Sequence, residues 1–267
     1  MMSAQKLETI RVAKPWGVDT LPPPFGASGE RVGEIWFDPP PGCPLLVKYL
    51  FTSERLSIQV HPDDPEAKRR GHAAGKEECW YILAAETDAR LGIGTRKRLD
   101  ADELRAAARS GAIEQLMEWH PIEAGMFFHI PAGTVHAIGG GVSLVEIQQN
   151  SDITYRLFDY GRPRELHLED GAAVALSRPM PPEQQQKVDT KRTALLLDSE
   201  HLGVMHVIGR EPALLGRPRD SAMLVPLEGR LCVDGIIAGA GECLWARDPE
   251  AIEASGDARF LAAWFKA

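Results

Sequence analysis

The sequence has few cysteines, no long apolar run and no excess of positive charge, and each absence excludes a class of protein. Its four cysteines form no C-x-x-C pair, which argues for reduced thiols rather than a disulfide framework. No stretch approaches the ~18 apolar residues of a membrane span, and no apolar h-region follows the first charges of MMSAQKLETIRVAKPWG. The net charge of −8 argues against a nucleic-acid or membrane partner. We therefore expect a cytoplasmic protein that binds a small molecule.

The sequence does contain four potential metal ligands: Gln59 and His61 in LSIQVHPDD, Glu78 in GKEECWY, and His136 in IPAGTVHAIG. No two of them have the i, i+4 spacing of a helix. Strand side chains alternate at period 2, so Gln59 and His61 are expected to face the same way inside a β-barrel. Two imidazoles, a carboxylate and an amide oxygen suit Zn²⁺, Fe²⁺, Mn²⁺ or Co²⁺. The ligand set alone does not choose among these metals.

Short apolar or alternating runs bounded by turn residues predict a mainly β protein. In the first part of the chain these runs cover 45–51, 55–61, 79–85, 89–94, 126–131, 141–149 and 154–160. A capping residue, Asp100, and an interruption at Gly111 predict a short helical insertion at about 100–119. We expect a catalytic metal-binding domain at 1–177, a Pro- and Gln-rich linker at 178–190, and a smaller β lobe at 191–267.

One segment matches a known barrel motif. GMFFHIPAGTVH, from Gly125 to His136, fits G-x5-P-x-G-x2-H, the second metal-binding motif of the cupin superfamily, at every specified position. Pro131 and Gly133 are expected to form a tight turn that brings His136 onto the inner face of the barrel. The first cupin motif is modified, because Q-x-H replaces H-x-H and the carboxylate follows later. The sequence thus resembles a cupin-type β-barrel or jelly roll followed by a second, smaller cupin-like lobe.

The departures from the cupin motif point to one family. KPWG (14–17), GEIWF (33–37), LSIQVHPDD, GKEECWYIL and PAGTVHAIGGGVSLVEIQQNSDITYRLFDYGR resemble type I mannose-6-phosphate isomerase, also called phosphomannose isomerase. The similarity covers roughly 10–172; after the linker only the general β character is similar. The resemblance implies a zinc enzyme, with one Zn²⁺ per chain, that interconverts mannose 6-phosphate and fructose 6-phosphate. It also implies a phosphosugar substrate, no nucleic-acid or membrane partner, and a monomer or homodimer.

The resemblance implies a set of roles in the site. The four ligands named above would hold the zinc. The family's active-site carboxylate and arginine fall on Glu146 and Arg156, and Ser57, Lys48 and Lys76 match positions that line the substrate cleft. Lys48 is expected to point toward the substrate phosphate together with Ser57. Arg156 is expected to stabilise an enediolate or to hold substrate oxygens through its planar fork, with an ion pair to Asp152 or Asp159 as the structural alternative.

Aldose–ketose isomerisation moves a proton between C2 and C1 through an enediol, which requires a base and a group that stabilises negative charge on oxygen. Glu146 is the leading candidate for the base, because a partly apolar barrel mouth is expected to raise the pKa of a carboxyl group. A metal-bound water and Lys76 as a neutral amine are the alternatives.

Two other functions stay open at this point. Two histidines and a carboxylate are also the ligands of an iron-dependent oxygenase, although the amide of Gln59 counts against that function. The second is a non-catalytic sugar-binding cupin. The presence of Glu146 and Arg156 in addition to all four ligands counts against it, because a binding module needs no acid/base group beside a metal.

Overall fold

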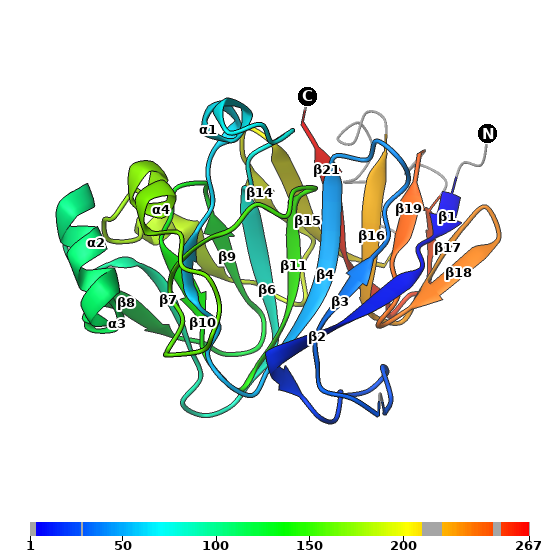
Figure 1. Cartoon of the computed structure of the whole chain (residues 1–267). Helices are drawn as coiled ribbons and strands as arrows, with labels where there is room; N and C mark the ends of the chain where they lie inside the picture. The colour runs from blue at the N-terminus through cyan, green and yellow to red at the C-terminus, as the bar shows by residue number, and fades with distance from the viewer. Residues whose placement is uncertain (1–3, 28, 210–220, 248–251, 267) are drawn as a thin grey trace.

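The computed structural model describes residues 4–27, 29–209, 221–247 and 252–266. Stacked β-sheets make up most of it, with short helices at one end (Figure 1), so the predicted mainly β fold class is confirmed. The helical segments are α1 (Asp64–Arg69), α2 (Ala101–Ser110), α3 (Ile113–Leu116), α4 (Leu168–Val174) and the 3-10 turn η1 (Pro182–Gln184). Within the described ranges, no helix has the length and apolar character needed to cross a membrane.

Two facing sheets form the first lobe. The central sheet has the strand order β13 (Gln185–Lys187), β9 (Met126–Ile130), β6 (Glu78–Ala85), β11 (Val142–Gln149), β4 (Leu45–Thr52), β3 (Val32–Phe37) and β2 (Thr9–Val18). The helix-side sheet has the order β12 (Tyr155–Phe158), β5 (Ile58–Val60), β10 (His136–Ile138), β7 (Arg90–Thr95) and β8 (Met117–Pro121). Helices α2, α3 and α4 lie beyond the helix-side sheet, at the left of Figure 1.

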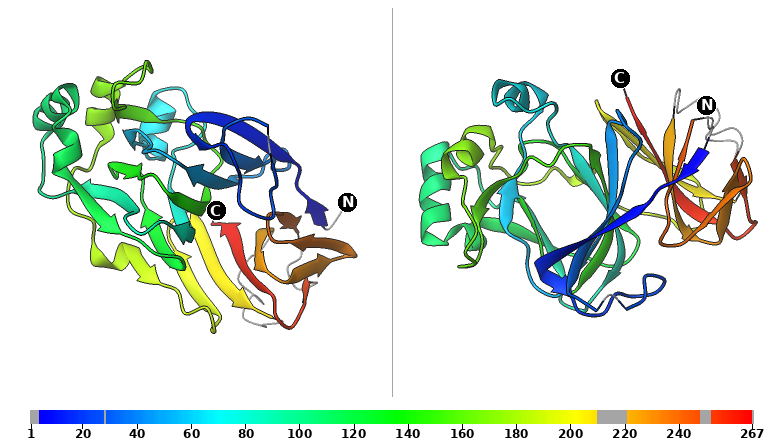
Figure 2. Two further views of the ribbon diagram at one scale, coloured as in Figure 1. Left: turned by 90° about the horizontal axis from the view of Figure 1, so that it is seen from below. Right: turned by 45° about the vertical axis from the view of Figure 1, so that its right-hand side comes forward.

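Two more sheets form the second lobe. The lobe sheet has the order β1 (Ala4–Lys6), β19 (Leu244–Ala246), β16 (Ala222–Glu228), β21 (Arg259–Phe265), β15 (Leu202–Ile208) and β14 (Ala194–Asp198). The terminal sheet has the order β18 (Ile236–Gly239), β17 (Arg230–Val233) and β20 (Ile252–Ala254). Both views in Figure 2 place this lobe, from yellow to red, on the side of the molecule away from α2.

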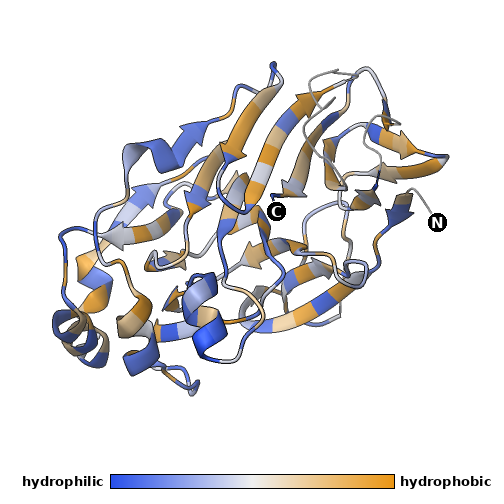
Figure 3. Ribbon diagram, turned by 90° about the horizontal axis from the view of Figure 1, so that it is seen from above, coloured by the Kyte–Doolittle hydropathy of each residue, from blue (hydrophilic) through white to orange (hydrophobic). Residues whose placement is uncertain are grey.

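The inner strands of the central sheet are buried on both faces, and period-2 alternation divides their side chains between two cores. On β11, Val145 and Ile147 pack in the core that the central sheet shares with the lobe sheet. Leu144 packs on the opposite face, in the core between the central and helix-side sheets, and Glu146 shares that face by its place in the alternation. The hydropathy colouring in Figure 3 shows orange bands on most strands, alternating with white and blue ones, and helices that are largely blue. This inner face of the central sheet thus carries apolar side chains and, at Glu146, a buried charged one.

The helical insertion follows its capping signals. Asp100 accepts a hydrogen bond from the backbone N–H of Glu103, whose side chain in turn accepts one from the N–H of Asp100, and Gly111 ends α2 in the left-handed region at φ 80°. The helical insertion predicted at about 100–119 is too long at its end, because Met117–Pro121 forms the strand β8. That segment pairs with β7, and the side chain of Met117 is fully buried. Tertiary pairing outweighs local helix propensity there.

The chain crosses between the lobes more often than the sequence suggested. The segment 178–190, predicted as a linker, contains η1 and β13, and β13 pairs with β9 of the central sheet. At the other end of the chain, β1 pairs with β19 of the lobe sheet, although residues 1–177 were assigned to the first domain. The domain boundaries themselves stay a prediction.

Candidate metal centre and adjoining cavity

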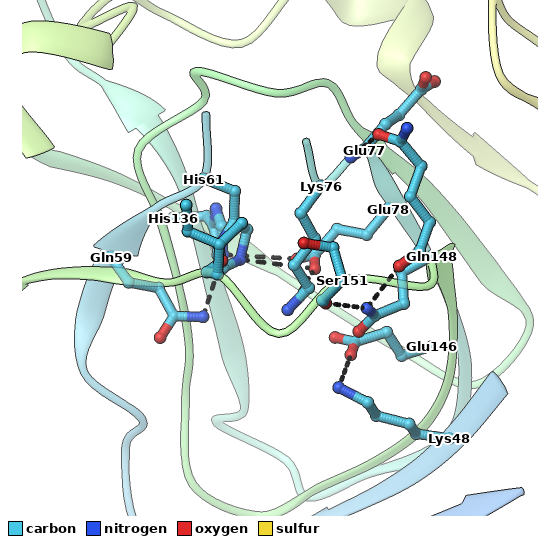
Figure 4. A network of polar contacts seen from close by, with 12 residues as sticks. Lys48, Gln59, His61, Lys76, Glu77, Glu78, His136, Glu146, Gln148 and Ser151 are labelled. Atoms are coloured by element: carbon cyan, nitrogen blue, oxygen red, sulfur yellow. Dashed lines mark hydrogen bonds and ion pairs between the residues drawn. The ribbon is translucent and has the colours of Figure 1, made fainter. Parts of the chain in front are cut away.

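Three of the four predicted ligands meet inside the first lobe. One potential ligand atom from each of His61, Glu78 and His136 lies within 4.8 Å of the others, and all three side chains are buried. Glu78 begins β6 and His136 begins β10, whereas His61 directly follows β5. Figure 4 shows the three side chains directed toward one another from these separate elements. The inward alternation expected from the sequence therefore brings them together, and this group has the composition and spacing to hold a metal ion.

Backbone carbonyls fix the two imidazoles in the form that a metal requires. The Nδ1–H of His61 donates to the carbonyl of Ile153 at 2.8 Å, and the Nδ1–H of His136 donates to the carbonyl of Thr134 at 2.9 Å. A carbonyl can only accept, so each Nε2 keeps a lone pair directed into the site. The Nε2 atom of His61 and both carboxylate oxygens of Glu78 are buried without a hydrogen-bond partner, although Lys76 Nζ lies 3.3 Å from one of the Glu78 oxygens. Such orphaned acceptors fit a bound cation, because they are costly when left unpaired.

The protonation states support the same interpretation. Burial lowers the pKa of His136 to about 4, and burial together with the nearby Lys76 lowers the pKa of His61 well below its usual range. Both imidazoles are thus neutral near pH 7, as metal ligands must be. Burial and the neighbouring Glu146 raise the pKa of Glu78 to about 7, against the opposing effect of Lys76. A cation would stabilise the ionised form of Glu78.

Gln59, the fourth predicted ligand, lies beside this group. Its Nε2 is 3.2 Å from Nε2 of His136, and its Oε1 accepts a hydrogen bond from the hydroxyl of Ser57 at 3.1 Å. This orientation directs the amide nitrogen, rather than the oxygen, toward the histidines. The two amide ends are distinguished only by their hydrogen bonds, and a half-turn of the amide places the oxygen on the side of His136.

A cavity of about 250 Å³ adjoins the three-ligand group. All the other predicted site residues line it, namely Lys48, Ser57, Gln59, Lys76, Glu146 and Arg156. Further charged residues from the described part of the chain, Lys14, Glu34, Asp152 and Arg164, complete a strongly polar wall. Such a lining suits a small, hydrophilic and anionic ligand.

Glu146 is ionised rather than protonated, which corrects the expectation of a raised pKa. Burial alone would raise the pKa of Glu146, but the ammonium groups of Lys48 and Lys76 outweigh it and hold the pKa below its usual range. Lys48 Nζ lies 3.3 Å from one carboxylate oxygen, and the indole N–H of Trp80 donates to the other at 3.0 Å. The expectation was wrong because it weighed the apolar surroundings without these two lysines.

The pKa values of the two buried lysines, Lys48 and Lys76, shift in opposite directions. Burial and the repulsion from Lys76 lower the pKa of Lys48. Burial also acts to lower the pKa of Lys76, but Glu78, at 3.3 Å, and Glu146 outweigh it and raise that pKa. Lys76 is therefore held as an ammonium group, which counts against its alternative role as a neutral amine base.

Arg156 lines the cavity without the ion pair that was its structural alternative. Its Nη1 donates to the carbonyl of Glu165 at 2.9 Å, and its Nε is buried without a hydrogen-bond partner. Asp159 instead accepts hydrogen bonds from Arg162 and from both Nε and Nη2 of Arg164. Within the described ranges, no ion pair joins Arg156 to Asp152 or Asp159, so part of its guanidinium group stays available to a ligand.

Sequence reasoning missed several cavity residues. Lys14 and Trp16 come from KPWG, and Glu34 comes from GEIWF; these segments contributed only to the family resemblance and carried no assigned role in the site. The signal that could have found Glu34 is a single charged residue among the apolar residues of a strand segment, as in V-G-E-I-W-F.

Asp63, which follows His61-Pro62, caps α1 by accepting a hydrogen bond from the backbone N–H of Glu66.

Comparisons with known proteins support the resemblance. No family model matches the chain. The chain is 41% identical over 137 residues to a mannose-6-phosphate isomerase of Streptococcus mutans, covering 49% of the chain and 43% of that protein. It is 37% identical over 172 residues to mannose-6-phosphate isomerase ManA of Bacillus subtilis, covering 60% of the chain and 54% of that protein. The chain thus spans about half the length of the curated relatives that it matches.

The fold is similar over the whole chain. The crystal structure of a mannose 6-phosphate isomerase from Bacillus subtilis has a TM-score of 0.77 at 25% identity, covering 98% of this chain and 99% of that one. The second lobe, for which the sequence gave only weak similarity, is therefore included in the match. The resemblance to mannose-6-phosphate isomerases that the motifs predicted is confirmed by these relatives.

Proposed function

We propose that this chain is a metal-dependent aldose–ketose isomerase that interconverts mannose 6-phosphate and fructose 6-phosphate. The observation that carries the proposal is a buried His–Glu–His group beside a cavity whose wall holds an ionised carboxylate, Glu146, between two lysines. The names of the relatives point to the same reaction. The cavity is strongly polar, as a phosphosugar requires.

We propose Zn²⁺ as the metal, one per chain, held by His61, Glu78, His136 and the amide oxygen of Gln59. Imidazole, carboxylate and amide ligands are within the preferences of zinc, and the orphaned acceptors of His61 and Glu78 support a cation at that point. When bound, the ion would supply Lewis acidity, which stabilises negative charge on a substrate oxygen.

Glu146 is proposed to move the proton between C2 and C1. Because Lys48 and Lys76 keep it ionised, it is ready to accept a proton without first losing one. The hydrogen bond from Trp80 orients one carboxylate oxygen, and the ion pair with Lys48 restrains the other. A carboxylate held on both oxygens keeps its position during the transfer, so little reorganisation precedes each step.

The remaining charges are proposed to bind the substrate. Lys76, held as an ammonium group, is placed to stabilise the developing enediolate. Arg156, which lines the cavity, is proposed to hold substrate oxygens through its guanidinium group, and Ser57 together with Lys48 is proposed to contact the phosphate. The predicted cytoplasmic location and the monomeric or dimeric state stay predictions.

One pair of measurements separates this proposal from the oxygenase alternative. The purified protein is incubated with mannose 6-phosphate, and fructose 6-phosphate formation and oxygen uptake are followed in parallel. Isomerisation without oxygen uptake is expected. Oxygen uptake dependent on the sugar would favour the oxygenase, and binding of the sugar without either reaction would favour a non-catalytic cupin.

A further inference from the structure

Lys14 and Glu34 form a second ion pair in the cavity wall, apart from the residues assigned so far. Lys14 Nζ lies 3.2 Å from Glu34 Oε1, and their side chains are 27% and 10% exposed. Both line the same cavity as Glu146 and Lys48. Glu34 is largely buried and Lys14 is partly buried, and because both line the cavity this ion pair is available to a ligand bound there.

The surrounding structure holds this pair in place. The indole N–H of Trp36 donates to the second oxygen of Glu34 at 2.5 Å, so that carboxylate is fixed at both ends. The stem of Lys14 lies against Gly33, where a Cβ would be only 2.6 Å from Cβ of Lys14. The register between β2 and β3 shifts between Ala13 and Val18, so the segment that carries Lys14 bulges out of the strand pairing. A bulge re-aims a side chain, here into the cavity.

Lys14 and Glu34 extend a row of charges of alternating sign along the cavity wall. Lys14, Glu34, Lys48 and Glu146 come from β2, β3, β4 and β11, which are neighbours in the central sheet. Trp36 connects the two ion pairs, because its N–H bonds Glu34 while Lys48 Nζ lies 4.4 Å from its ring centroid. A ligand that lies along this wall meets hydrogen-bond donors and acceptors in turn.

The opposite charges of Lys14 and Glu34 determine which chemical group of a ligand this ion pair can bind. A phosphate dianion beside Lys14 would also lie beside the carboxylate of Glu34, which repels it, whereas beside Lys48 the ammonium group of Lys76 offsets the charge of Glu146. A sugar hydroxyl has no such conflict, because it accepts a hydrogen bond from the ammonium group and donates one to the carboxylate. We propose that Lys14 and Glu34 together bind a hydroxyl group of the sugar chain and so set the affinity for the phosphosugar. This inference rests on the proposed isomerase function.

The test compares steady-state kinetics and inhibition by inorganic phosphate in four proteins: wild type, Lys14→Met, Glu34→Gln and Lys6→Met. Methionine keeps the stem that packs on Gly33, and glutamine keeps an acceptor for Trp36, so folding is preserved. Lys6, which pairs with Glu242 at the surface with 41% of its side chain exposed, is the matched control. Melting temperature and bound metal per chain are measured for each protein.

Hydrogen bonds to charged groups contribute roughly 1.5–3 kcal/mol, so KM for mannose 6-phosphate is expected to rise about tenfold or more in Lys14→Met and Glu34→Gln. The kcat, the bound metal and the inhibition constant of inorganic phosphate are expected to stay close to wild type, and Lys6→Met to be unchanged throughout. An unchanged KM in both cavity variants of an active enzyme would overturn this inference alone. A parallel rise in the phosphate inhibition constant would also overturn it, since Lys14 would then bind phosphate. An inactive wild-type protein would overturn the proposed function as well.

Discussion

Lys48 and Glu146 are directly opposite each other on β4 and β11, with Nζ 3.3 Å from Oε1. Both side chains are nearly inaccessible to water, at 4% and 7% exposure. A buried ion pair is weak evidence for stability, because the loss of hydration offsets the attraction. Its position beside a cavity and a candidate metal centre gives a functional reason for its presence.

Replacement of the proposed base tests its role separately from that of the metal. Glu146→Gln keeps an acceptor for the Trp80 N–H but removes the charge that accepts the proton. General-base catalysis contributes about 10²–10⁴-fold, so kcat is expected to fall by that order. Bound metal, measured by elemental analysis, is expected to stay at the wild-type level. Loss of metal in this variant would contradict the assignment of Glu146 to proton transfer.

Removal of a proposed ligand is expected to have the opposite signature. His136→Ala deletes one of two neutral imidazoles in the buried group, and the remaining residues cannot complete a four-coordinate site. Both bound metal and turnover are expected to fall to background. A variant that retains wild-type metal content would show that the ion binds elsewhere. Far-UV circular dichroism provides the control for folding.

The position of the candidate metal centre was predictable because it depends on local pattern. Period-2 alternation places Gln59 and His61 on one face, and the Pro131–Gly133 turn precedes the strand that begins at His136. The end of α2 at Gly111 was predictable from an equally local signal, the glycine itself. Where a short motif determines backbone direction, the side-chain position follows from it.

The electrostatics of the site could not be predicted in the same way. The pKa of Glu146 depends on Lys48, which comes from another strand, and on Lys76, which precedes β6. The contribution of Lys14 depends on a bulge between β2 and β3, which interrupts the alternation that sequence reasoning follows. Long-range pairing determines both features, and no single segment encodes it.

A glycine next to the metal centre allows a close backbone approach. At Gly75, a Cβ would lie 2.5 Å from the backbone carbon of Asp63, and its N–H donates to the side chain of Asp64 at 2.8 Å. Gly75→Ala is expected to destabilise the fold by about 1–3 kcal/mol, because backbone must shift, and to weaken metal binding through the adjacent Lys76–Glu78 segment. Gly256→Ala, where no atom of the described residues lies within 4 Å of the added Cβ, is the matched control. Equal denaturant midpoints for the two variants would contradict the close approach.

A buried histidine between the lobes predicts acid sensitivity. His206 donates from Nδ1 to the carbonyl of Arg192 at 3.0 Å, and its ring stacks on Tyr81 of β6. Burial lowers the pKa of His206, so the folded state keeps it neutral, whereas the unfolded chain binds a proton below the ordinary histidine pKa of 6.5. The stability that it contributes is therefore present above pH 6.5 and is lost as the pH falls.

Replacement of this histidine is expected to remove part of that dependence. His206→Phe retains the stacking but cannot titrate, so its free energy of unfolding is expected to fall less than that of wild type between pH 7 and about pH 5. Urea titrations of both metal-saturated proteins at several pH values measure the difference. Identical slopes against pH would show that His206 titrates alike in both states.

The proposed isomerisation depends on a metal held by the buried His–Glu–His group. The most direct test measures the rate of fructose 6-phosphate formation in one preparation that is stripped by a chelator and then titrated with Zn²⁺, with bound metal determined at each step. The rate is expected to fall to background without metal and to rise in proportion to occupancy, up to about one ion per chain. Full turnover by the metal-free protein, or no turnover at full occupancy, would contradict it.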